Sequence, residues 1–321
     1  MVKKEKNRIR VAIACQGGGS HTAFTAGALK RILKEKTDKY EIVALSGTSG
    51  GAICALLTWY GLLSNDRNKA AQLLDSFWKE ISASSYPDML MNEWFVGSSR
   101  LQGTAPVLDI SPYYYPPLAQ ERLKDILERL VKFDMIEGMI KKTSPDLLVG
   151  AVDVRSGDFK VFKNSEISVA SILASAAIPT FLRAVHVNGN IYWDGLFSQN
   201  PPVRNFVDGV ASKPDEIWVI QINPQNRKNE PISVRDIMDR RNELSGNLSL
   251  YQELGFIEKV NTWVKAGYLP AGKYKHIDVR WIQMLNEELD TASKVDRDPS
   301  FIQYMMKYGE EQAGKFLAQS G

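Results

Sequence analysis

Short apolar runs that lead through glycine-rich turns into helical patterns define the first part of the chain. Residues 8–15 have the pattern of a buried strand, and the three glycines at 17–19 connect it to a helical pattern over residues 21–34. Residues 40–45 form a second apolar run, which a glycine-flanked turn joins to an apolar helix starting near Gly50. Because this strand, turn and helix unit repeats, the pattern predicts a parallel sheet.

Strand and helix patterns continue to alternate along the rest of the chain. Further strands are predicted at residues 147–152, 158–162, 185–187, 191–193, 216–222 and 276–282. Helical patterns lie at residues 69–82, 119–133, 169–176, 233–244, 253–265 and 301–317. This alternation predicts the α/β class.

The domain organisation follows from the lack of any Gly/Ser-rich or Pro-rich linker. We expect a single domain over residues 8–321, with a core at about 8–230 and a mainly helical C-terminal extension, 231–321, packed on it. Residues 1–7 are expected to form a flexible basic tail.

One stretch, residues 84–117, departs from the alternating pattern, and we call it the aromatic insertion. It gathers tyrosine, methionine, tryptophan and phenylalanine with five prolines and shows little periodicity. The pattern predicts a long irregular segment, and segments of this length inside a domain are usually functional or disordered. Its aromatic content argues against disorder.

Composition and charge exclude several classes of protein. With 321 residues, 44% hydrophobic and 24% charged, the chain is neither disordered, collagenous nor a coiled coil. Forty Lys and Arg against 37 Asp and Glu leave a net charge of +3 without a basic stripe, so we expect no binding of nucleic acid. Three histidines and two cysteines lack metal-binding spacings, and we expect neither a metal nor another cofactor.

The apolar segments also bear on location. The run at 11–15 is too short for the apolar part of a secretory signal. Residues 42–65 carry no charge, but the small polar residues at 46–51 interrupt them and favour a buried helix over a membrane span. We expect a cytoplasmic protein whose contact with membranes, if any, is peripheral.

The second glycine turn carries the strongest candidate for chemistry. Gly47-Thr48-Ser49-Gly50-Gly51 matches G-x-S-x-G, in which the serine lies on a strained turn between strand and helix and exposes its hydroxyl. The pentapeptide alone is also compatible with a plain tight turn.

The first glycine turn suits a supporting role. The backbone N–H groups of residues 17–19 can stabilise the oxyanion that acyl transfer generates. A nucleotide site is not indicated, because Thr22 stands where G-x-G-x-x-G requires glycine. A P-loop requires Gly-Lys-Ser/Thr where this chain has Gly19, Ser20 and His21.

Three blocks in order along the chain resemble the patatin-like phospholipase family. They are residues 17–21 with 27–29, residues 47–51, and Asp194-Gly195 followed by Asn200-Pro201. Supporting stretches at 174–179 and 216–224 extend the resemblance over roughly residues 11–224.

The resemblance implies a fold and a reaction. It implies a three-layer α/β/α sandwich with a mainly parallel central sheet, and a phospholipase A or lysophospholipase type of lipid acyl hydrolase. Ser49 would be the nucleophile and Asp194 its proton acceptor in a Ser-Asp dyad, and Gly17, Gly18 and Gly19 would line the oxyanion hole. A carboxylate within hydrogen-bond reach can take up the serine proton, so this chemistry needs neither histidine nor calcium.

The chain departs from the family pattern at two places. His21 and Thr22 stand where many members have a basic residue and glycine, so a role for a fixed positive charge at this position is not expected to carry over. Leu196 replaces a small residue after Asp194-Gly195, a change that can reshape the acyl pocket.

Two alternatives remain open from the sequence. Ser49, an aspartate and His276 follow the chain order of an α/β-hydrolase triad. A catalytically silent scaffold that binds lipid or protein through residues 84–117 is the other alternative. If the chain is a lipid hydrolase, tyrosine and tryptophan in the same insertion would suit peripheral contact with a membrane; the competing hypothesis is a self-packed surface loop.

Overall fold

The structure is a computed structural model that describes residues 8–35, 39–101, 110–270, 273–286 and 289–319. The predicted tail at 1–7 lies outside these ranges. The strands are β1 (Ile9–Cys15), β2 (Tyr40–Gly47), β3 (Asp146–Asp153), β4 (Phe159–Lys163), β5 (Val185–Val187), β6 (Asn190–Asp194), β7 (Glu216–Gln221) and β8 (Asp278–Gln283).

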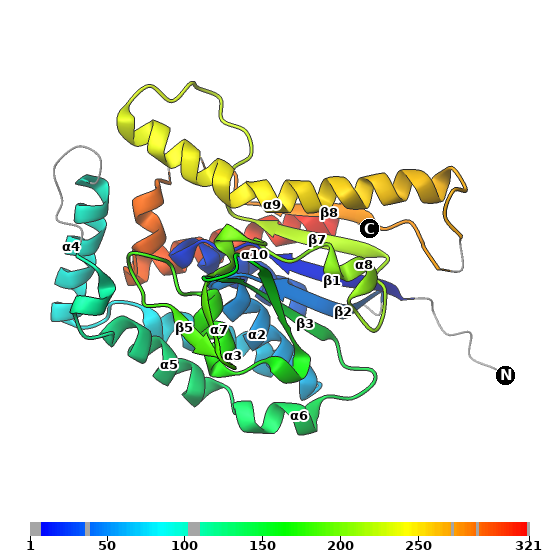
Figure 1. The fold of residues 1–321 in the computed structure, drawn as a ribbon, viewed down its shortest axis with the longest axis horizontal. Helices are drawn as coiled ribbons and strands as arrows, with labels where there is room; N and C mark the ends of the chain where they lie inside the picture. Colours follow the sequence, from blue (N-terminus) through cyan, green and yellow to red (C-terminus); the bar gives the residue numbers. More distant parts are fainter. Residues whose placement is uncertain (1–7, 36–38, 102–109, 271–272, 287–288, 320–321) are drawn as a thin grey trace.

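The helices lie around these strands (Figure 1). The α-helices are α1 (Ala23–Leu33), α2 (Gly50–Leu63), α3 (Arg67–Ile81), α4 (Tyr86–Leu101), α5 (Leu118–Leu130), α6 (Ile136–Met139), α7 (Val169–Ser175), α8 (Asn205–Asp208), α9 (Val234–Lys265) and α10 (Pro299–Ala318). The 3-10 helices are η1 (Gly19–Thr22), η2 (Pro112–Tyr114), η3 (Phe133–Met135), η4 (Asn164–Glu166), η5 (Gly195–Phe197) and η6 (Thr291–Val295).

All of these strands join one sheet, in the order β5-β6-β3-β2-β1-β7-β8, with β4 paired to β3. The central pairs β3-β2, β2-β1, β1-β7 and β7-β8 are parallel, whereas β4, β5 and β6 run antiparallel to their neighbours. The mainly parallel α/β sheet predicted from the sequence is therefore confirmed. The two strands that precede the glycine turns, β1 and β2, pair in parallel.

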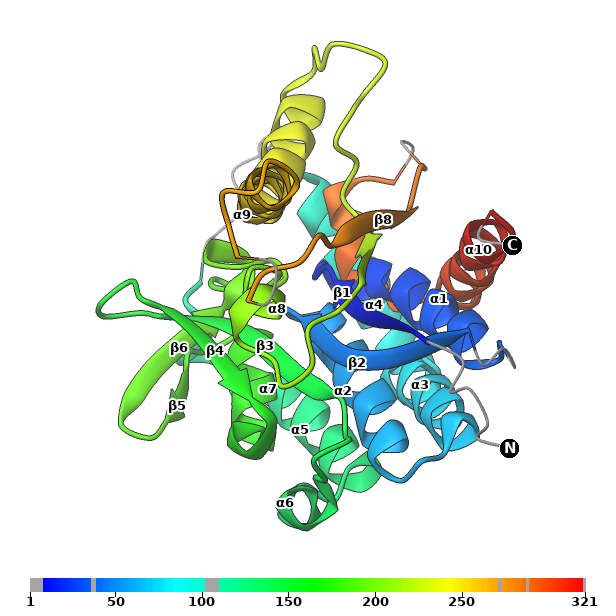
Figure 2. The ribbon, with the colours of Figure 1, turned by 90° about the vertical axis from the view of Figure 1, so that its right-hand side faces the viewer.

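Side chains that alternate along β1 divide the core into two halves. Val11, Ile13 and Cys15 pack with α1, α2, α3 and α10 on one face of the sheet. Ala12 and Ala14 belong to a second cluster on the other face, which α8 and α9 cover. Figure 2 shows these helices on opposite sides of the sheet, which is the expected three-layer α/β/α arrangement.

Residues after 230 contribute to both the sheet and a helical layer. β8 extends the sheet by pairing in parallel with β7. α10 packs directly on α1, and a Cβ atom placed on Gly27 would lie 1.8 Å from the carbonyl oxygen of Met306, so the two backbones touch. Among the helices of the described residues, none combines the length and apolar character needed to cross a bilayer.

The aromatic insertion is more regular than predicted, because α4 occupies its first half. The helix buries Asn92, whose side-chain amide donates to Asp296 at 2.8 Å, and leaves Tyr86, Leu90 and Trp94 exposed. Its buried side is thus partly polar and its exposed side apolar. The expectation of an irregular segment was wrong for this half. A sequence pattern identifies a helix by the apolar face that it buries, and α4 instead buries a partly polar face.

The first half of α9 shows the same inversion. α9 is one helix, whereas the sequence pattern predicted two. Its first half buries Glu243, Gly246 and Asn247. On the outside it exposes four apolar residues, which we call the apolar stripe of α9: Val234, Ile237, Leu244 and Leu248. The second half follows the ordinary pattern and buries Leu250, Leu254, Ile257 and Val260.

Candidate active site

Ser49 lies on a sharp turn between β2 and α2. Its backbone has φ +56° and ψ −130°, in the positive-φ region that residues other than glycine rarely adopt. A Cβ atom on Gly51 would lie 2.3 Å from the carbonyl oxygen of Cys15, so only glycine allows α2 to start this close to β1. This is the geometry of the strained serine turn that the G-x-S-x-G pattern predicts.

A neighbouring serine holds this turn in place. The N–H of Ser49 donates to the carbonyl oxygen of Ser175 at 3.1 Å and to its Oγ at 3.0 Å. The Ser175 hydroxyl in turn donates to the carbonyl oxygen of Gly150 in β3 at 2.7 Å. Ser175 therefore links the turn to α7 and to the sheet, a positioning role that the sequence analysis did not assign.

Asp194 ends β6 and is fully buried. Its backbone N–H donates to Ala177 at 3.0 Å, and its Oδ1 accepts the N–H of Leu196 at 2.8 Å. Burial raises the pKa of this carboxyl to about 7, while the hydrogen bond from Leu196 and the hydroxyl of Ser49 act to lower it.

The structure brings Asp194 and Ser49 together. The Ser49 hydroxyl lies near enough to lower the pKa of Asp194, yet Asp194 Oδ2 is buried without a fully formed hydrogen bond to any described residue. Catalytic hydrogen bonds are often long before substrate binds and tighten in the complex. The free oxygen is therefore suited to accept a proton from Ser49.

The glycine turn at 17–19 packs against the same serine. A Cβ atom on Gly17 would lie 2.4 Å from the carbonyl oxygen of Thr48 and 3.0 Å from Cβ of Ser49. The N–H of Gly17 donates to Asn200 Oδ1 at 2.7 Å. For Gly18 and Gly19, no acceptor of the backbone N–H is found among the described residues, so these two groups differ from Gly17.

His21 follows the glycine turn and is almost completely buried. Its Nε2 lies 2.7 Å from the hydroxyl of Ser293 in η6. Burial, together with the nearby charge of Lys294, lowers the pKa of His21 to about 3, against a weaker opposing effect of Asp290. His21 is therefore neutral at physiological pH and does not itself supply a positive charge.

Leu196 lies between the candidate site and α9. Its Cδ1 would be 3.5 Å from a Cβ atom on Gly246 in α9. Asn200 also reaches α9, where its Nδ2 donates to the Gly246 carbonyl at 3.2 Å and its N–H to the Ser249 hydroxyl at 3.0 Å. The leucine at this position thus packs toward the helix that covers this side of the sheet.

His276 lies at the amino end of the edge strand β8. It precedes β8, whose first residue pairs with the first residue of β7, whereas Ser49 follows the carboxyl end of β2. The imidazole is more than half exposed and lies 3.0 Å from Asp278 Oδ1. The hypothesis of a triad with His276 as base is therefore wrong, because the parallel strands separate it from Ser49 by their full length.

Comparison with solved structures finds 14 similar chains, among them the following three. VipD from Legionella pneumophila has a TM-score of 0.44 and 11% identity, over 97% of this chain and 67% of VipD. The type III effector protein ExoU has a TM-score of 0.37 and 14% identity, over 96% of this chain and 53% of ExoU. ExoU in its heterodimeric complex with SpcU, from Pseudomonas aeruginosa, has a TM-score of 0.37 and 13% identity, over 97% of this chain and 51% of that ExoU chain. This chain thus spans about half the length of ExoU.

Comparison by sequence gives a more direct result. No curated protein matches the chain. The family model described as patatin-like phospholipase matches residues 13–207, which include the glycine turn, Ser49 and Asp194 and make up more than half of the chain. The chain therefore belongs to the patatin-like phospholipase family, a family of lipid acyl hydrolases.

Proposed function

We propose that this protein is a phospholipase A or lysophospholipase type of enzyme that cleaves a carboxylic ester of its lipid through an acyl-Ser49 intermediate. The observation that carries the proposal is the pairing of Ser49, on its strained turn, with a buried Asp194 whose pKa is about 7. A general base works best when its pKa lies near the working pH, and an ordinary aspartate would be far too weak a base.

The reaction proceeds in two halves. Ser49 Oγ attacks the acyl carbonyl carbon, its proton passes to Asp194 Oδ2, and the carbonyl electron pair moves to oxygen. When this oxyanion collapses, the bond to the leaving alcohol breaks and Asp194 returns the proton to the alcohol oxygen. A water molecule then attacks the acyl-serine and gives its proton to Asp194. Collapse of the second oxyanion releases the fatty acid, and the proton returns to Ser49 Oγ.

The oxyanion is stabilised by backbone N–H groups of the glycine turn, residues 17–19, which is packed against Ser49. Gly18 and Gly19 donate, and the N–H of Gly50, which directly follows the nucleophile, is a third donor. Gly17 lines the hole, but its own N–H is held by Asn200 and fixes the turn. No step requires a metal ion.

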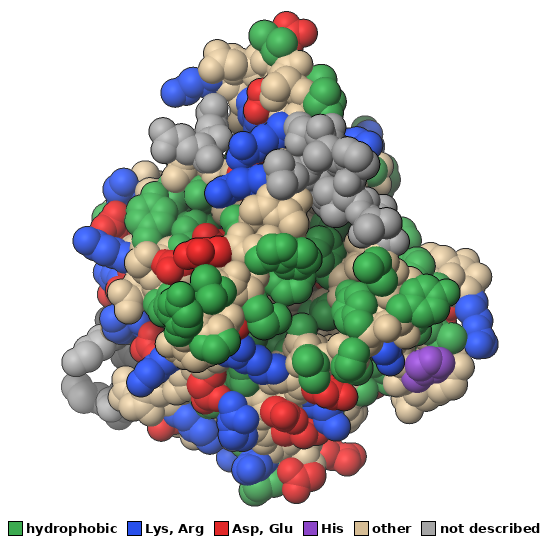
Figure 3. All heavy atoms as spheres, turned by 90° about the vertical axis from the view of Figure 1, so that its left-hand side faces the viewer, with side chains coloured by type: hydrophobic (Ala, Val, Ile, Leu, Met, Phe, Trp, Pro, Cys, Tyr) green, Lys and Arg blue, Asp and Glu red, His purple; other side chains and the backbone are tan. Residues whose placement is uncertain are grey.

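Contact with the lipid surface is made by α4 and the first half of α9. Figure 3 shows the side of the molecule that carries both helices, with hydrophobic side chains gathered across it. On α4 and the residues after it, the exposed apolar side chains are Tyr86, Met89, Leu90, Met91, Trp94, Phe95, Ile110, Tyr113, Tyr114, Tyr115 and Leu118, and the apolar stripe of α9 adds four more. Residues 102–109 of the aromatic insertion lie outside the described residues.

A labelling experiment tests the active site. A fluorophosphonate probe should label the wild-type protein and Asp215→Asn, a variant at a half-buried aspartate just before β7, but not Ser49→Ala. The same proteins, with Asp194→Asn added, are then assayed on a panel of phospholipids, lysophospholipids and neutral acylglycerols. Turnover by Ser49→Ala at the wild-type rate, or no hydrolysis of any lipid by wild type, would refute the proposed function.

A further inference from the structure

η6 brings a lysine to the glycine turn from a distant part of the sequence. In Figure 1 this short helix, drawn in orange, lies between α4 and the start of α9. It packs closely on the turn, because the Lys294 carbonyl oxygen would lie 2.1 Å from a Cβ atom on Gly19, which itself has φ +57°. The side chain of Lys294 then passes Gly18, where its Cε would be 3.9 Å from a Cβ atom.

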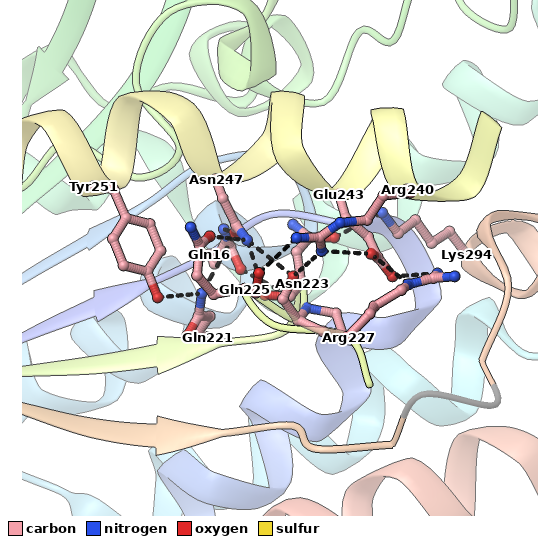
Figure 4. A network of polar contacts seen from close by, with 11 residues as sticks. Gln16, Gln221, Asn223, Gln225, Arg227, Arg240, Glu243, Asn247, Tyr251 and Lys294 are labelled. Carbon is pink, nitrogen blue, oxygen red and sulfur yellow. Dashed lines mark hydrogen bonds and ion pairs between the residues drawn. The ribbon is translucent and has the colours of Figure 1, made fainter. Parts of the chain in front are cut away.

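The ammonium group of Lys294 has a hydrogen-bond acceptor but no counter-ion. Nζ donates to Asn223 Oδ1 at 2.7 Å, and within the described residues no carboxylate lies at ion-pair distance from it. Glu243, in α9, is instead bound by Arg227 at 2.7 and 2.9 Å and by Arg240 at 3.1 Å (Figure 4). The charge of Lys294 is thus not neutralised by a direct partner.

This arrangement is costly in the free protein. The side chain of Lys294 is partly exposed, and its ammonium group is largely surrounded by protein. Burial lowers the pKa of Lys294 to about 8, while the more distant charges of Glu243 and Asp239 act to raise it, so that the amine is mostly protonated at pH 7. A buried unpaired charge is stabilised when an anion binds beside it.

The ammonium group of Lys294 lies along the same glycine turn that packs against Ser49, which attacks the ester. Gly17 touches Ser49, and Gly18, the next residue of the same turn, touches the Lys294 side chain. An ammonium group has three N–H donors, of which Asn223 takes one, so two remain for a ligand. In a phospholipid, the glycerol unit places a phosphate a few bonds away from the acyl ester.

We propose that Lys294 binds the phosphate group of a phospholipid substrate while Ser49 attacks its acyl ester. The proposal rests on the proposed function and assigns the residue that recognises the phosphate of its substrates. Asn223 is the positioning residue, because its amide oxygen holds Nζ beside the turn. Neutral acylglycerols would lack this contact and be poorer substrates.

A pair of substrates with the same acyl chain tests the proposal by kinetics. One is a lysophospholipid and the other a monoacylglycerol, both used as dispersed monomers. Lys294→Met should lower kcat/KM for the lysophospholipid by about ten- to a hundredfold, mainly through KM, and change that for the monoacylglycerol less than about threefold. Lys294→Arg should recover part of the loss, and Lys307→Met, at an exposed lysine, should match wild type. Equal losses on both substrates, or none, would overturn the proposal.

Binding tests the same site without catalysis. An ether lysophospholipid, which has no ester to cleave, is titrated into wild type, Ser49→Ala and Lys294→Met. The first two should bind it equally and Lys294→Met at least tenfold more weakly, with a melting temperature no lower than that of wild type. Unchanged binding by Lys294→Met refutes the proposal even if the enzyme is active, as does inorganic phosphate binding as tightly as the ether lipid. Failure of the proposed function appears separately, as hydrolysis of neither substrate.

Discussion

Replacing Asp194 with asparagine is expected to remove activity and, at the same time, to stabilise the folded protein. The amide keeps the size of the side chain and its bond from Leu196 but cannot accept the proton of Ser49, a change that costs on the order of a hundred- to ten-thousandfold in rate. The ionised carboxylate is also penalised by burial. The difference between its pKa of about 7 and the ordinary 3.8 corresponds to about 4 kcal/mol of lost stability.

The sign of this effect fixes its pH dependence. Because the pKa in the folded state is raised, the folded protein binds the proton more tightly than the unfolded chain. The penalty is complete above about pH 7, falls as the pH is lowered and disappears below about pH 4. The free energy of unfolding of Asp194→Asn should therefore exceed that of wild type by about 4 kcal/mol at pH 8 and by less than half of that at pH 5.

Denaturant unfolding of wild type and Asp194→Asn at pH 8 and pH 5 measures both values. Asp215→Asn is a control for which the opposite change is expected. Burial acts to raise the pKa of Asp215, but hydrogen bonds from Arg10 and Lys275 lower it to about 2. Removing this carboxylate should therefore destabilise the protein at pH 8. If Asp194→Asn is no more stable than wild type at pH 8, or gains equally at both pH values, Asp194 does not carry a penalised charge and the reasoning fails.

Three further predictions concern the reaction and the lipid surface. On a short soluble ester, kcat/KM should fall about tenfold per pH unit below about pH 7, because a protonated Asp194 cannot act as base; a flat profile would contradict this. His276→Ala should retain activity within about threefold in the same assay, whereas a loss like that of Ser49→Ala would contradict the exclusion of His276 as the base. The double substitution Trp94→Ser with Phe95→Ser should weaken binding to phospholipid vesicles and spare the soluble ester, and equal loss of both would indicate a folding defect.

Much of the fold could be predicted because the parallel core obeys local patterns. β1, β2 and β7 each contain a continuous apolar run of at least four residues, as expected of strands covered on both faces. The two inverted helices could not be predicted in the same way. The middle of α9 contains Gly246 and Asn247, which favour a helix end, but contacts with Asn223 and Gln16 hold them in a continuous helix.

The residues of the candidate site likewise divide into those that the sequence marks and those that only the fold brings together. Ser49 could be proposed because the G-x-S-x-G spacing reports local backbone geometry, and Asp194 because its block resembles the patatin-like phospholipase family. The structure places both side chains near each other. The roles we assign to Ser175 and Lys294 depend on which elements meet in space. Lys294 lies more than 270 residues from the glycine turn that it contacts, and no local pattern marks its partner.

The polar attachment of the first half of α9 determines how this segment responds to temperature and to denaturant. Releasing residues 234–248 from the body would uncover amide and charged groups but little new apolar surface, since the apolar stripe already faces outward. The heat-capacity change and the denaturant dependence of an opening both grow with the surface that it uncovers. The backbone amides of this segment should therefore exchange with deuterium through a local opening whose free energy varies little with denaturant, well before the sheet itself unfolds.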